Sequence, residues 1–272
     1  MAGSAGERVV TFCADDLGAS PGVNEGILAA CDEGPIRRAS VLATGRALAE
    51  AARAAADRED RLEIGFHFSL TAGPALTRAG RSLGSTPGGL LRRALLGGLD
   101  REKARAELEA QWERLGEAGF TPTYLDGHHH VHLLPGLAEA AADFARDKGL
   151  RRIRLVGEPL VLPPRRRLLA RLLLNRLSRR AAPLFTAAGL PVKERSLGLG
   201  LWQVPSFRTA LVRLVRTLPP GRWEIFTHPR RVDGEFARLD PQAGRGGDPG
   251  PGELAALTDP SLAGELGEAF PR

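Results

Sequence analysis

The chain has 272 residues, of which 43% are hydrophobic and 26% charged, and its formal net charge is +6. This length suits one large α/β domain, and no apolar run approaches the ~20 residues that cross a bilayer, so we expect a cytoplasmic protein without an export signal. Arginine supplies most of the basic excess, but no zinc finger, RNP-like strand or helix-turn-helix pattern accompanies it, which argues against nucleic-acid binding.

Strands and helices alternate along the first half of the chain. An apolar, β-branched run predicts a buried strand over residues 8–14. Cys13 in this strand and Cys31 in the helix after it form no metal-type pair, and we interpret both as packing residues in a reducing compartment. The elements expected next are a helix over 22–34, a strand over 39–44, a helix over 46–58, a strand over 62–68, a Gly/Pro-containing loop over 71–100, a helix over 101–119 and a strand over 123–127.

The second half continues the pattern, with a weaker signal between residues 157 and 200. Residues 163–180 alternate arginine with leucine and predict a helix whose arginines lie along the surface, with a membrane-surface patch as the alternative. Repeated strand–helix alternation favours a parallel barrel in a single domain over 1–272, with its core at about 8–230. The other elements expected are a helix over 136–148, strands over 151–156 and 222–228, and an irregular tail over 231–272.

The histidines share one position in the predicted fold. All six lie within or just past the C-terminal end of a predicted strand, and so does the pair Asp15 and Asp16. In a (β/α) barrel these strand ends converge on one mouth, where catalytic residues meet. Imidazole and carboxylate are common ligands of a catalytic divalent metal, so one aspartate and two histidines could bind an ion while the second aspartate acts as a general base. The histidines are His67, His128, His129, His130, His132 and His228.

Three of these elements also have a purely structural interpretation when taken alone. Asp15 and Asp16 could form a turn or a helix cap. His67 could be a core residue of an apolar strand, and His228 could simply end a strand before a proline. It is their joint placement at strand ends that favours a site.

The segment DGHHHVH, residues 126–132, is the densest of the elements. If it stays extended, its period of two places His128, His130 and His132 on one face while His129 points away. A functionless loop cluster is the alternative. The segment follows a predicted strand and ends where a helix begins, which favours a functional role.

Four motifs together resemble a known family. They occur in the order and rough spacing of the YdjC-like (ChbG-type) carbohydrate deacetylases, and the resemblance runs from about residue 8 to 230. It implies a distorted (β/α) TIM-like barrel of the glycoside hydrolase/deacetylase type. It also implies removal of acetyl from an N-acetylated sugar with one divalent metal ion, Mg²⁺ by resemblance and Zn²⁺ by donor chemistry. The motifs are VTFCADDLGASPGVNEGI, EIGFHFSLTAGPAL, PTYLDGHHHVHLLPGL and EIFTHP.

The resemblance also implies roles for individual residues. Asp16, His67 and His128 match the metal ligands of the family. Asp15 resembles the general base, and His228 is the expected general acid for the leaving amine. The residues expected to orient these groups or to contact the sugar are Asp126, His130 and His132.

The sequence departs from the family pattern at its last motif. The family usually has a cysteine and a glycine around this His-Pro pair, whereas here Thr227 precedes it and Arg230 follows it. The stretch after the motif is short and rich in Gly and Pro, which is a second departure and bears on the substrate contacts from that region.

The sequence leaves the substrate and the partners open. The family includes enzymes for chitooligosaccharides and a hopanoid-associated (HpnK-like) branch that acts on an N-acetylglucosaminyl lipid. The arginine- and leucine-rich segment would suit the lipid and a peripheral contact with the inner membrane, and a homodimer is also left open. Two other classes remain: another metal-dependent barrel enzyme acting on a sugar, such as an isomerase or a phosphoesterase, and a non-catalytic sugar-binding protein.

Overall fold

The computed structural model describes residues 8–159, 167–243 and 248–267. In these residues seven parallel strands form one sheet in the order β5-β4-β3-β2-β1-β7-β6. The strands are β1 (Arg8–Leu17), β2 (Ile36–Val41), β3 (Glu63–Phe68), β4 (Tyr124–Gly127), β5 (Arg152–Ile153), β6 (Arg195–Leu197) and β7 (Gly221–Thr227).

The two edges of the sheet meet and close it into a barrel. Val156, just after edge strand β5, forms a parallel bridge with Ser196 in edge strand β6. The Ser196 N–H donates to the Leu155 carbonyl and the Gly157 N–H donates to the Ser196 carbonyl, both at 2.8 Å. The predicted distorted (β/α) barrel is therefore confirmed.

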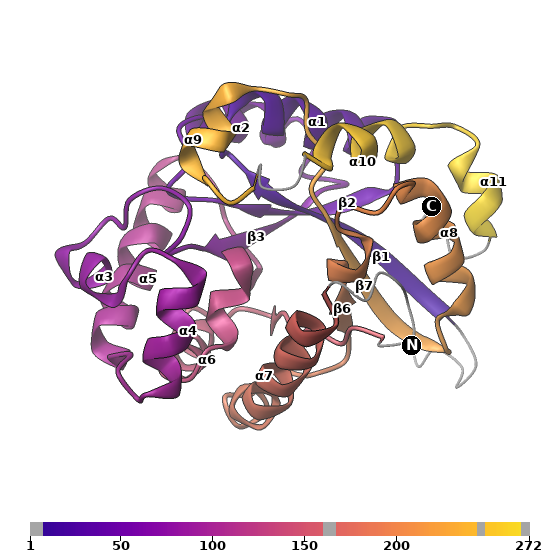
Figure 1. Cartoon of the computed structure of the whole chain (residues 1–272). Helices are drawn as coiled ribbons and strands as arrows, with labels where there is room; N and C mark the ends of the chain where they lie inside the picture. The colour runs from indigo at the N-terminus through magenta and orange to yellow at the C-terminus, as the bar shows by residue number, and fades with distance from the viewer. Residues whose placement is uncertain (1–7, 160–166, 244–247, 268–272) are drawn as a thin grey trace.

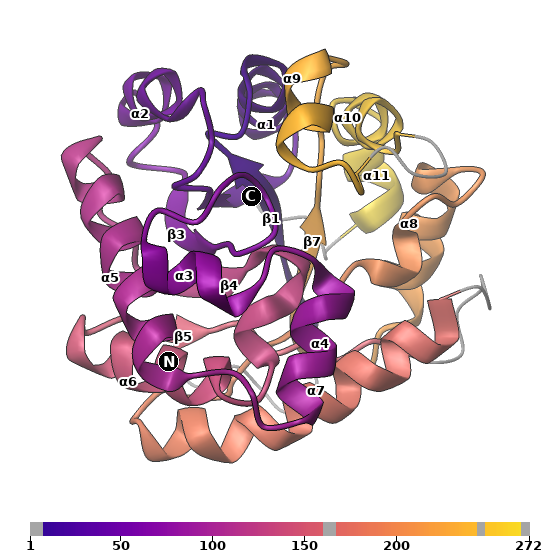
Figure 2. The ribbon, with the colours of Figure 1, turned by 60° about the vertical axis from the view of Figure 1, so that its left-hand side comes forward.

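Helices surround the strands (Figures 1 and 2). In both views α1, α2, α9 and α10 lie along the top, α5 and α6 on the left, α7 at the bottom, and α8 and α11 on the right. The helices are α1 (Pro21–Asp32), α2 (Leu48–Ala56), α3 (Arg78–Leu83), α4 (Pro87–Leu95), α5 (Arg101–Glu117), α6 (Leu137–Asp147), α7 (Leu168–Ala187), α8 (Phe207–Thr217), α9 (Gly234–Leu239), α10 (Gly250–Leu257) and α11 (Leu262–Leu266).

The barrel interior is polar as well as apolar. Gly65 in β3 pairs with Tyr124 in β4, and a Cβ on Gly65 would lie 2.1 Å from the Tyr124 ring, so only glycine leaves room for it. The Tyr124 hydroxyl reaches Cys13 Sγ at 3.2 Å and Ser40 Oγ at 3.1 Å. Cys13 and Cys31 are both buried and unpaired with each other, in agreement with the sequence analysis.

Several predicted elements need correction. The stretch expected to be a loop over 71–100 contains α3 and α4, whose N-termini are capped by the Thr77 and Thr86 side chains. β6 and α8 were not predicted from the sequence, because β6 is short and α8 follows the weakly patterned region. Of the segment 163–180, the first four residues lie outside the described residues and the rest is helical from Leu168.

The expectation of an irregular tail over 231–272 is wrong for the part that the structure describes. It contains α9, α10 and α11. The Asp233 side chain caps α9 by accepting from the Glu235 and Phe236 N–H groups, a local signal that the turn-rich composition obscured. Among the described helices, none combines the length and the apolar character that spanning a membrane requires.

Candidate active site

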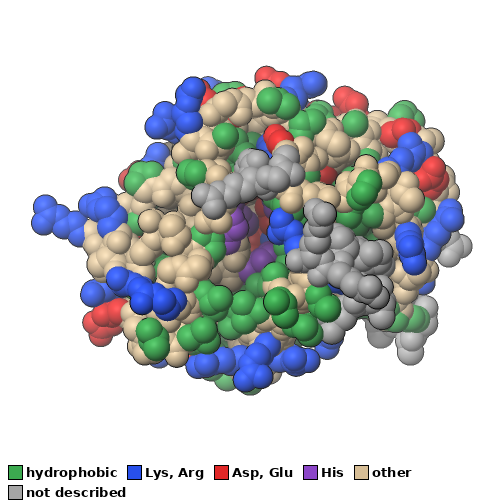
Figure 3. Space-filling view, viewed as in Figure 1, with side chains coloured by type: hydrophobic (Ala, Val, Ile, Leu, Met, Phe, Trp, Pro, Cys, Tyr) green, Lys and Arg blue, Asp and Glu red, His purple; other side chains and the backbone are tan. Residues whose placement is uncertain are grey.

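The carboxyl ends of β1, β3, β4 and β7 surround a cavity of about 470 Å³. Figure 3 shows this hollow with histidine side chains on its floor. Asp126 and His132, which were expected to orient the ligands or to contact the sugar, do not line the cavity and are fully buried. The predicted site residues that do line it are Asp15, Asp16, His67, His128, His130 and His228.

Asp16, His67 and His128 converge on one point. Asp16 Oδ1 lies 2.8 Å from His128 Nδ1 and 3.3 Å from His67 Nε2. One potential ligand atom from each of the three residues lies within 4.8 Å of the other two. This is the set that the family resemblance implied for a metal ion, and the structure brings its members together from three strand ends.

The backbone of Asp16 explains how two adjacent aspartates reach the same cavity. Asp16 has φ 75°, a left-handed conformation that non-glycine residues seldom adopt. The pairing of β1 with β2 shifts register between Ala14 and Leu17, so this part of β1 is bulged. Successive side chains of a regular strand point to opposite faces, so without the bulge Asp15 and Asp16 would do the same. Strain of this kind is characteristic of functional sites.

A carboxylate lies behind His67. Asp126 Oδ1 is 2.7 Å from His67 Nδ1, and Asp126 Oδ2 accepts from Ser40 Oγ at 2.6 Å. This contact fixes the ring so that Nε2 faces Asp16. Asp126 therefore positions a neighbour rather than contacting the cavity.

The two buried histidines lie in a strongly negative environment. Burial opposes their charge, but Asp126 raises the pKa of His67 to about 10 and Asp16 raises that of His128 to about 9. The negative charge around the two rings favours a cation at this position, either a proton on the rings or a metal ion.

Asp15 is held by a buried arginine that the sequence analysis missed. Arg154 donates to Asp15 through both guanidinium NH groups at 2.6 and 2.9 Å. It also contacts Asp126 and Glu224, each at 2.8 Å, and its side chain is 1% exposed. Burial raises the pKa of Asp15, while Arg154 opposes that rise. The only sequence signal was an arginine alternating with apolar residues just after β5.

The histidine cluster is not extended. Residues His128–Leu133 form a 3₁₀ segment in which His129 and His130 have left-handed φ of 52° and 56°. The prediction that His129 points away from its neighbours is therefore wrong, because His129 lines the cavity as His128 and His130 do. Its Nδ1 lies 2.9 Å from Thr71 Oγ1.

The other two histidines of the cluster have structural contacts. The His130 ring packs 5.0 Å from the Phe226 ring, centroid to centroid, at the cavity wall. His132 Nε2 contacts the Arg154 carbonyl oxygen at 3.0 Å. His132 therefore supports the segment that carries Arg154, from a position away from the cavity.

Asp240 is a further acidic residue of the cavity that the sequence analysis missed. Its Oδ2 lies 3.2 Å from His128 Nε2 and 3.5 Å from His129 Nε2. His128, His129 and Asp240 form a second group that could hold a metal, adjoining the first through His128. Asp240 falls just after α9, in the stretch that was expected to be irregular.

His228 directly follows β7 and lines the cavity, where it packs on an aromatic side chain. Its ring is 4.9 Å from the Trp202 ring and perpendicular to it. Its main-chain N–H donates to Glu253 of α10 at 2.6 Å, so α10 supports this strand end. Burial lowers the pKa of His228 to about 3, and the ring is neutral near pH 7.

Part of the cavity wall is apolar. Leucines of α7 and one leucine of α4 form most of it, and Arg167 stacks over Trp202 at 5.6 Å beside them. The residues of this wall include Leu91, Leu173, Leu174, Leu177, Leu199 and Trp202.

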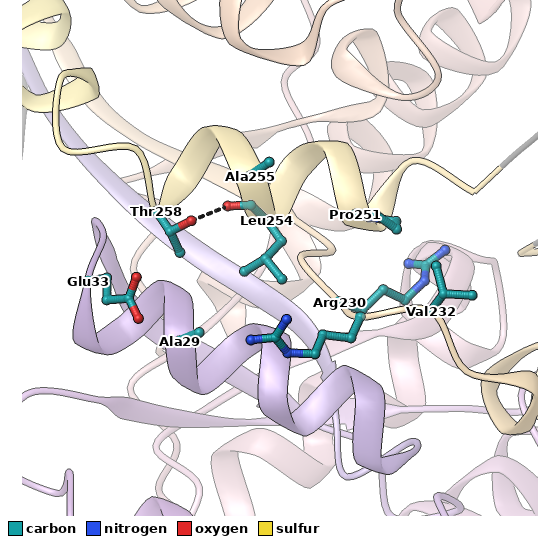
Figure 4. Close-up of a pocket in the computed structure, with 9 residues that line it drawn as sticks. Ala29, Glu33, Arg230, Val232, Pro251, Leu254, Ala255 and Thr258 are labelled. Carbon is teal, nitrogen blue, oxygen red and sulfur yellow. Dashed lines mark hydrogen bonds between the residues drawn. The ribbon is translucent and has the colours of Figure 1, made fainter.

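A second groove of about 430 Å³ lies between α1 and α10 (Figure 4). Arg230, Val232 and Leu254 line it, and Arg230 is paired with Asp248. None of the predicted site residues lines this groove. The cavity at the barrel mouth is therefore the candidate site.

Comparison with known proteins agrees with this geometry. A family model described as "YdjC-like protein" matches residues 9–268, beyond the limit of about 230 seen in the motifs. Two chitooligosaccharide deacetylases, from Klebsiella pneumoniae strain 342 and from K. pneumoniae subsp. pneumoniae strain ATCC 700721 / MGH 78578, are 39% and 38% identical over 151 residues. Each match covers 53% of this chain and 58% of the relative, so the matched part of this chain spans somewhat more than half of their length.

A solved structure shares the fold. The crystal structure of a protein from Enterococcus faecalis V583, described as a "putative cellobiose-phosphate cleavage protein", superposes with a TM-score of 0.72. The sequences are 21% identical, and the match covers 96% of this chain and 94% of the other. At this identity the likeness supports the barrel architecture alone.

Proposed function

Because this chain belongs to the YdjC-like protein family, we propose that it is a carbohydrate N-deacetylase that uses one divalent metal ion. Its substrate would be a sugar or glycolipid that contains N-acetylglucosamine. The names of the two Klebsiella relatives support the reaction type. The observation that carries the proposal is the convergence of Asp16, His67 and His128 in one cavity beside Asp15 and His228.

The residues present fit a divalent ion. Asp16, His67 and His128 offer one carboxylate and two imidazoles, a common donor set for catalytic metals. All three are buried, and Asp126 holds the His67 ring from behind, as carboxylates do at metal-bound histidines. The group that includes the more exposed His129 is the weaker candidate. A bound ion would polarise the acetyl carbonyl and lower the pKa of a water molecule.

Asp15 is placed to act as the general base. Its carboxylate lines the cavity next to Asp16, and Arg154 fixes its orientation through two hydrogen bonds. Burial raises its pKa, which makes the carboxylate a better proton acceptor. Asp15 would take a proton from water as the water oxygen bonds to the acetyl carbon.

His228 faces the same cavity and is the proposed general acid. Cleavage of the amide C–N bond releases acetate, and the departing nitrogen needs a proton to leave as an amine. Because burial lowers the pKa of His228 to about 3, the resting ring is neutral, and the proton that it gives to the amine would be the one that Asp15 takes from the water.

The apolar part of the cavity wall favours a substrate that has an apolar portion. A soluble chitooligosaccharide presents mainly hydroxyl groups, whereas leucines from α7 and α4 form part of the cavity wall. Such a wall suits the apolar part of a lipid-linked sugar, which supports an N-acetylglucosaminyl lipid such as a hopanoid as substrate.

The substrate proposal is tested by measuring acetate release from diacetylchitobiose, N-acetylglucosamine and an N-acetylglucosaminyl lipid, each with and without chelator. We expect chelator-sensitive acetate from at least one of them, with the highest kcat/KM for the lipid-linked sugar. Absence of acetate from every substrate would contradict the deacetylase proposal. A preference for the soluble disaccharide would contradict only the lipid assignment.

His67→Ala is expected to weaken metal binding by more than about tenfold, because it removes a ligand and leaves Asp126 without its partner. Isothermal titration with Zn²⁺ and with Mg²⁺ measures the loss and shows which ion the wild-type protein binds more tightly. His130→Ala serves as the matched control, since its ring packs on Phe226 and lies outside the ligand group. Equal metal affinity in wild-type protein and His67→Ala would show that the ion is bound elsewhere.

A further inference from the structure

Two helices beside the cavity expose leucines to solvent. Leu95 at the end of α4 is 71% exposed and Leu96, just after it, is 76% exposed. On α7, Leu169 is 82% exposed and Leu172 is 41% exposed. These four residues, which we call the leucine rim, are four of the six large hydrophobic side chains that are exposed in the described residues.

Basic residues accompany the leucine rim. Arg92 and Arg93 on α4 are exposed, as are Arg176 and Arg179 on α7. Neither helix contains an acidic residue within its bounds. Two other arginines of α7, Arg171 and Arg180, pair with glutamates outside these helices. The surface of the two helices therefore combines apolar side chains with exposed arginines, a combination that favours anionic lipid.

The leucine rim continues the apolar wall of the cavity. Leu91 and Leu173 line the cavity. Leu95 lies four residues after Leu91, and Leu169 lies four residues before Leu173, so these two exposed leucines each share a helix face with a cavity leucine. In Figure 2 α4 and α7 lie close together, and Figure 3 shows hydrophobic side chains below the histidines with Lys and Arg side chains under them.

We propose that the α4/α7 surface docks on an anionic phospholipid bilayer, with the leucine rim in the headgroup layer and the arginines against lipid phosphates. The cavity mouth would then open toward the membrane, and its apolar wall would receive the lipid part of a substrate. Docking is inferred from the α4/α7 surface alone, whereas delivery of a lipid-linked sugar rests on the proposed function. Apolar insertion and electrostatic attraction act together, because either one alone gives only weak and reversible binding.

The test is flotation of the full chain with vesicles of phosphatidylcholine alone and of phosphatidylcholine with phosphatidylglycerol. Wild-type protein is expected to float with the anionic vesicles and to remain below with the neutral ones. The double variant Leu95→Ser/Leu96→Ser is expected to bind anionic vesicles roughly tenfold more weakly. Val232→Ser is the matched control, because Val232 is also 76% exposed but lies at the groove between α1 and α10.

Two results would overturn the proposal. One is failure of the wild-type protein to float with anionic vesicles, which would assign this surface to an acidic protein or another partner. The other is equal flotation of the double variant and the wild type, because the leucine rim would then have no part in binding.

Acetate release from soluble diacetylchitobiose, measured on the same variants, separates this inference from the proposed function. Loss of flotation with the activity retained confirms docking by the leucine rim, since Leu95 and Leu96 do not line the cavity. Flotation without acetate release from any substrate would leave docking in place and contradict the deacetylase.

Discussion

Asp15→Asn is expected to slow acetate release by about 10²–10⁴-fold while the protein still binds its metal ion. Asparagine has nearly the same shape and can keep one contact with Arg154, but it cannot take a proton from water. The metal group of Asp16, His67 and His128 does not include Asp15. The measurements are kcat for acetate release and metal content of the purified variant.

The control for this variant is Asp57→Asn, at an exposed position after α2. It should leave both the rate and the metal content unchanged. Near-normal acetate release by Asp15→Asn would show that another residue is the base. Loss of metal together with activity would instead place Asp15 among the ligands.

Arg154→Met is expected to lower the free energy of unfolding by about 3–5 kcal/mol, the usual effect of removing one partner from a buried ion pair. Arg154 contacts Asp15, Asp126 and Glu224, and all four side chains are buried. Methionine fills similar space but leaves three carboxylates close together without this cation. Urea denaturation measures the loss.

The pH dependence of the unfolding free energy distinguishes the loss of charge from the loss of packing in Arg154→Met. In the wild type, burial acts to raise the pKa of Glu224, but Arg154 and the neighbouring arginines lower it to about 2. The folded carboxylate therefore stabilises the wild type above the unfolded pKa of about 4.3, and this contribution is lost as the pH falls toward 2. Without Arg154 the carboxyl pKa values rise, so stability should increase as the pH is lowered from 8 toward 5.

Two further variants serve as controls for Arg154→Met. Arg151→Met changes an exposed arginine and should have little effect. Arg154→Lys keeps the charge and should fold, but with a lower kcat, because lysine cannot hold both oxygens of Asp15. Stability of Arg154→Met equal to that of the wild type would contradict this account of the buried network.

The sequence predicted the parts of this molecule that depend on local pattern. Alternation of strands and helices predicted the barrel, and the histidines at strand ends predicted which side chains meet. Asp15, Asp16, His67 and His228 reach one cavity because parallel strands bring their carboxyl ends to one mouth.

The parts that the sequence did not predict depend on long-range contacts or on local strain. Arg154 is recognisable only through carboxylates that lie 28, 70 and 139 residues away. Asp240 follows a helix in a stretch whose composition indicated turns. Histidine is among the non-glycine residues enriched in the left-handed region, but the run of histidines does not indicate that His129 and His130 are the ones that adopt it.

The central claim is that one metal ion held by Asp16, His67 and His128 supports acetate release. The most direct measurement is the rate of acetate release from chelator-stripped protein as a divalent ion is added back, with bound metal determined in the same samples. We predict that activity returns in proportion to bound metal and saturates at one ion per chain, and that His67→Ala does not recover. Full activity of the stripped protein, or recovery of His67→Ala alongside the wild type, would contradict the claim.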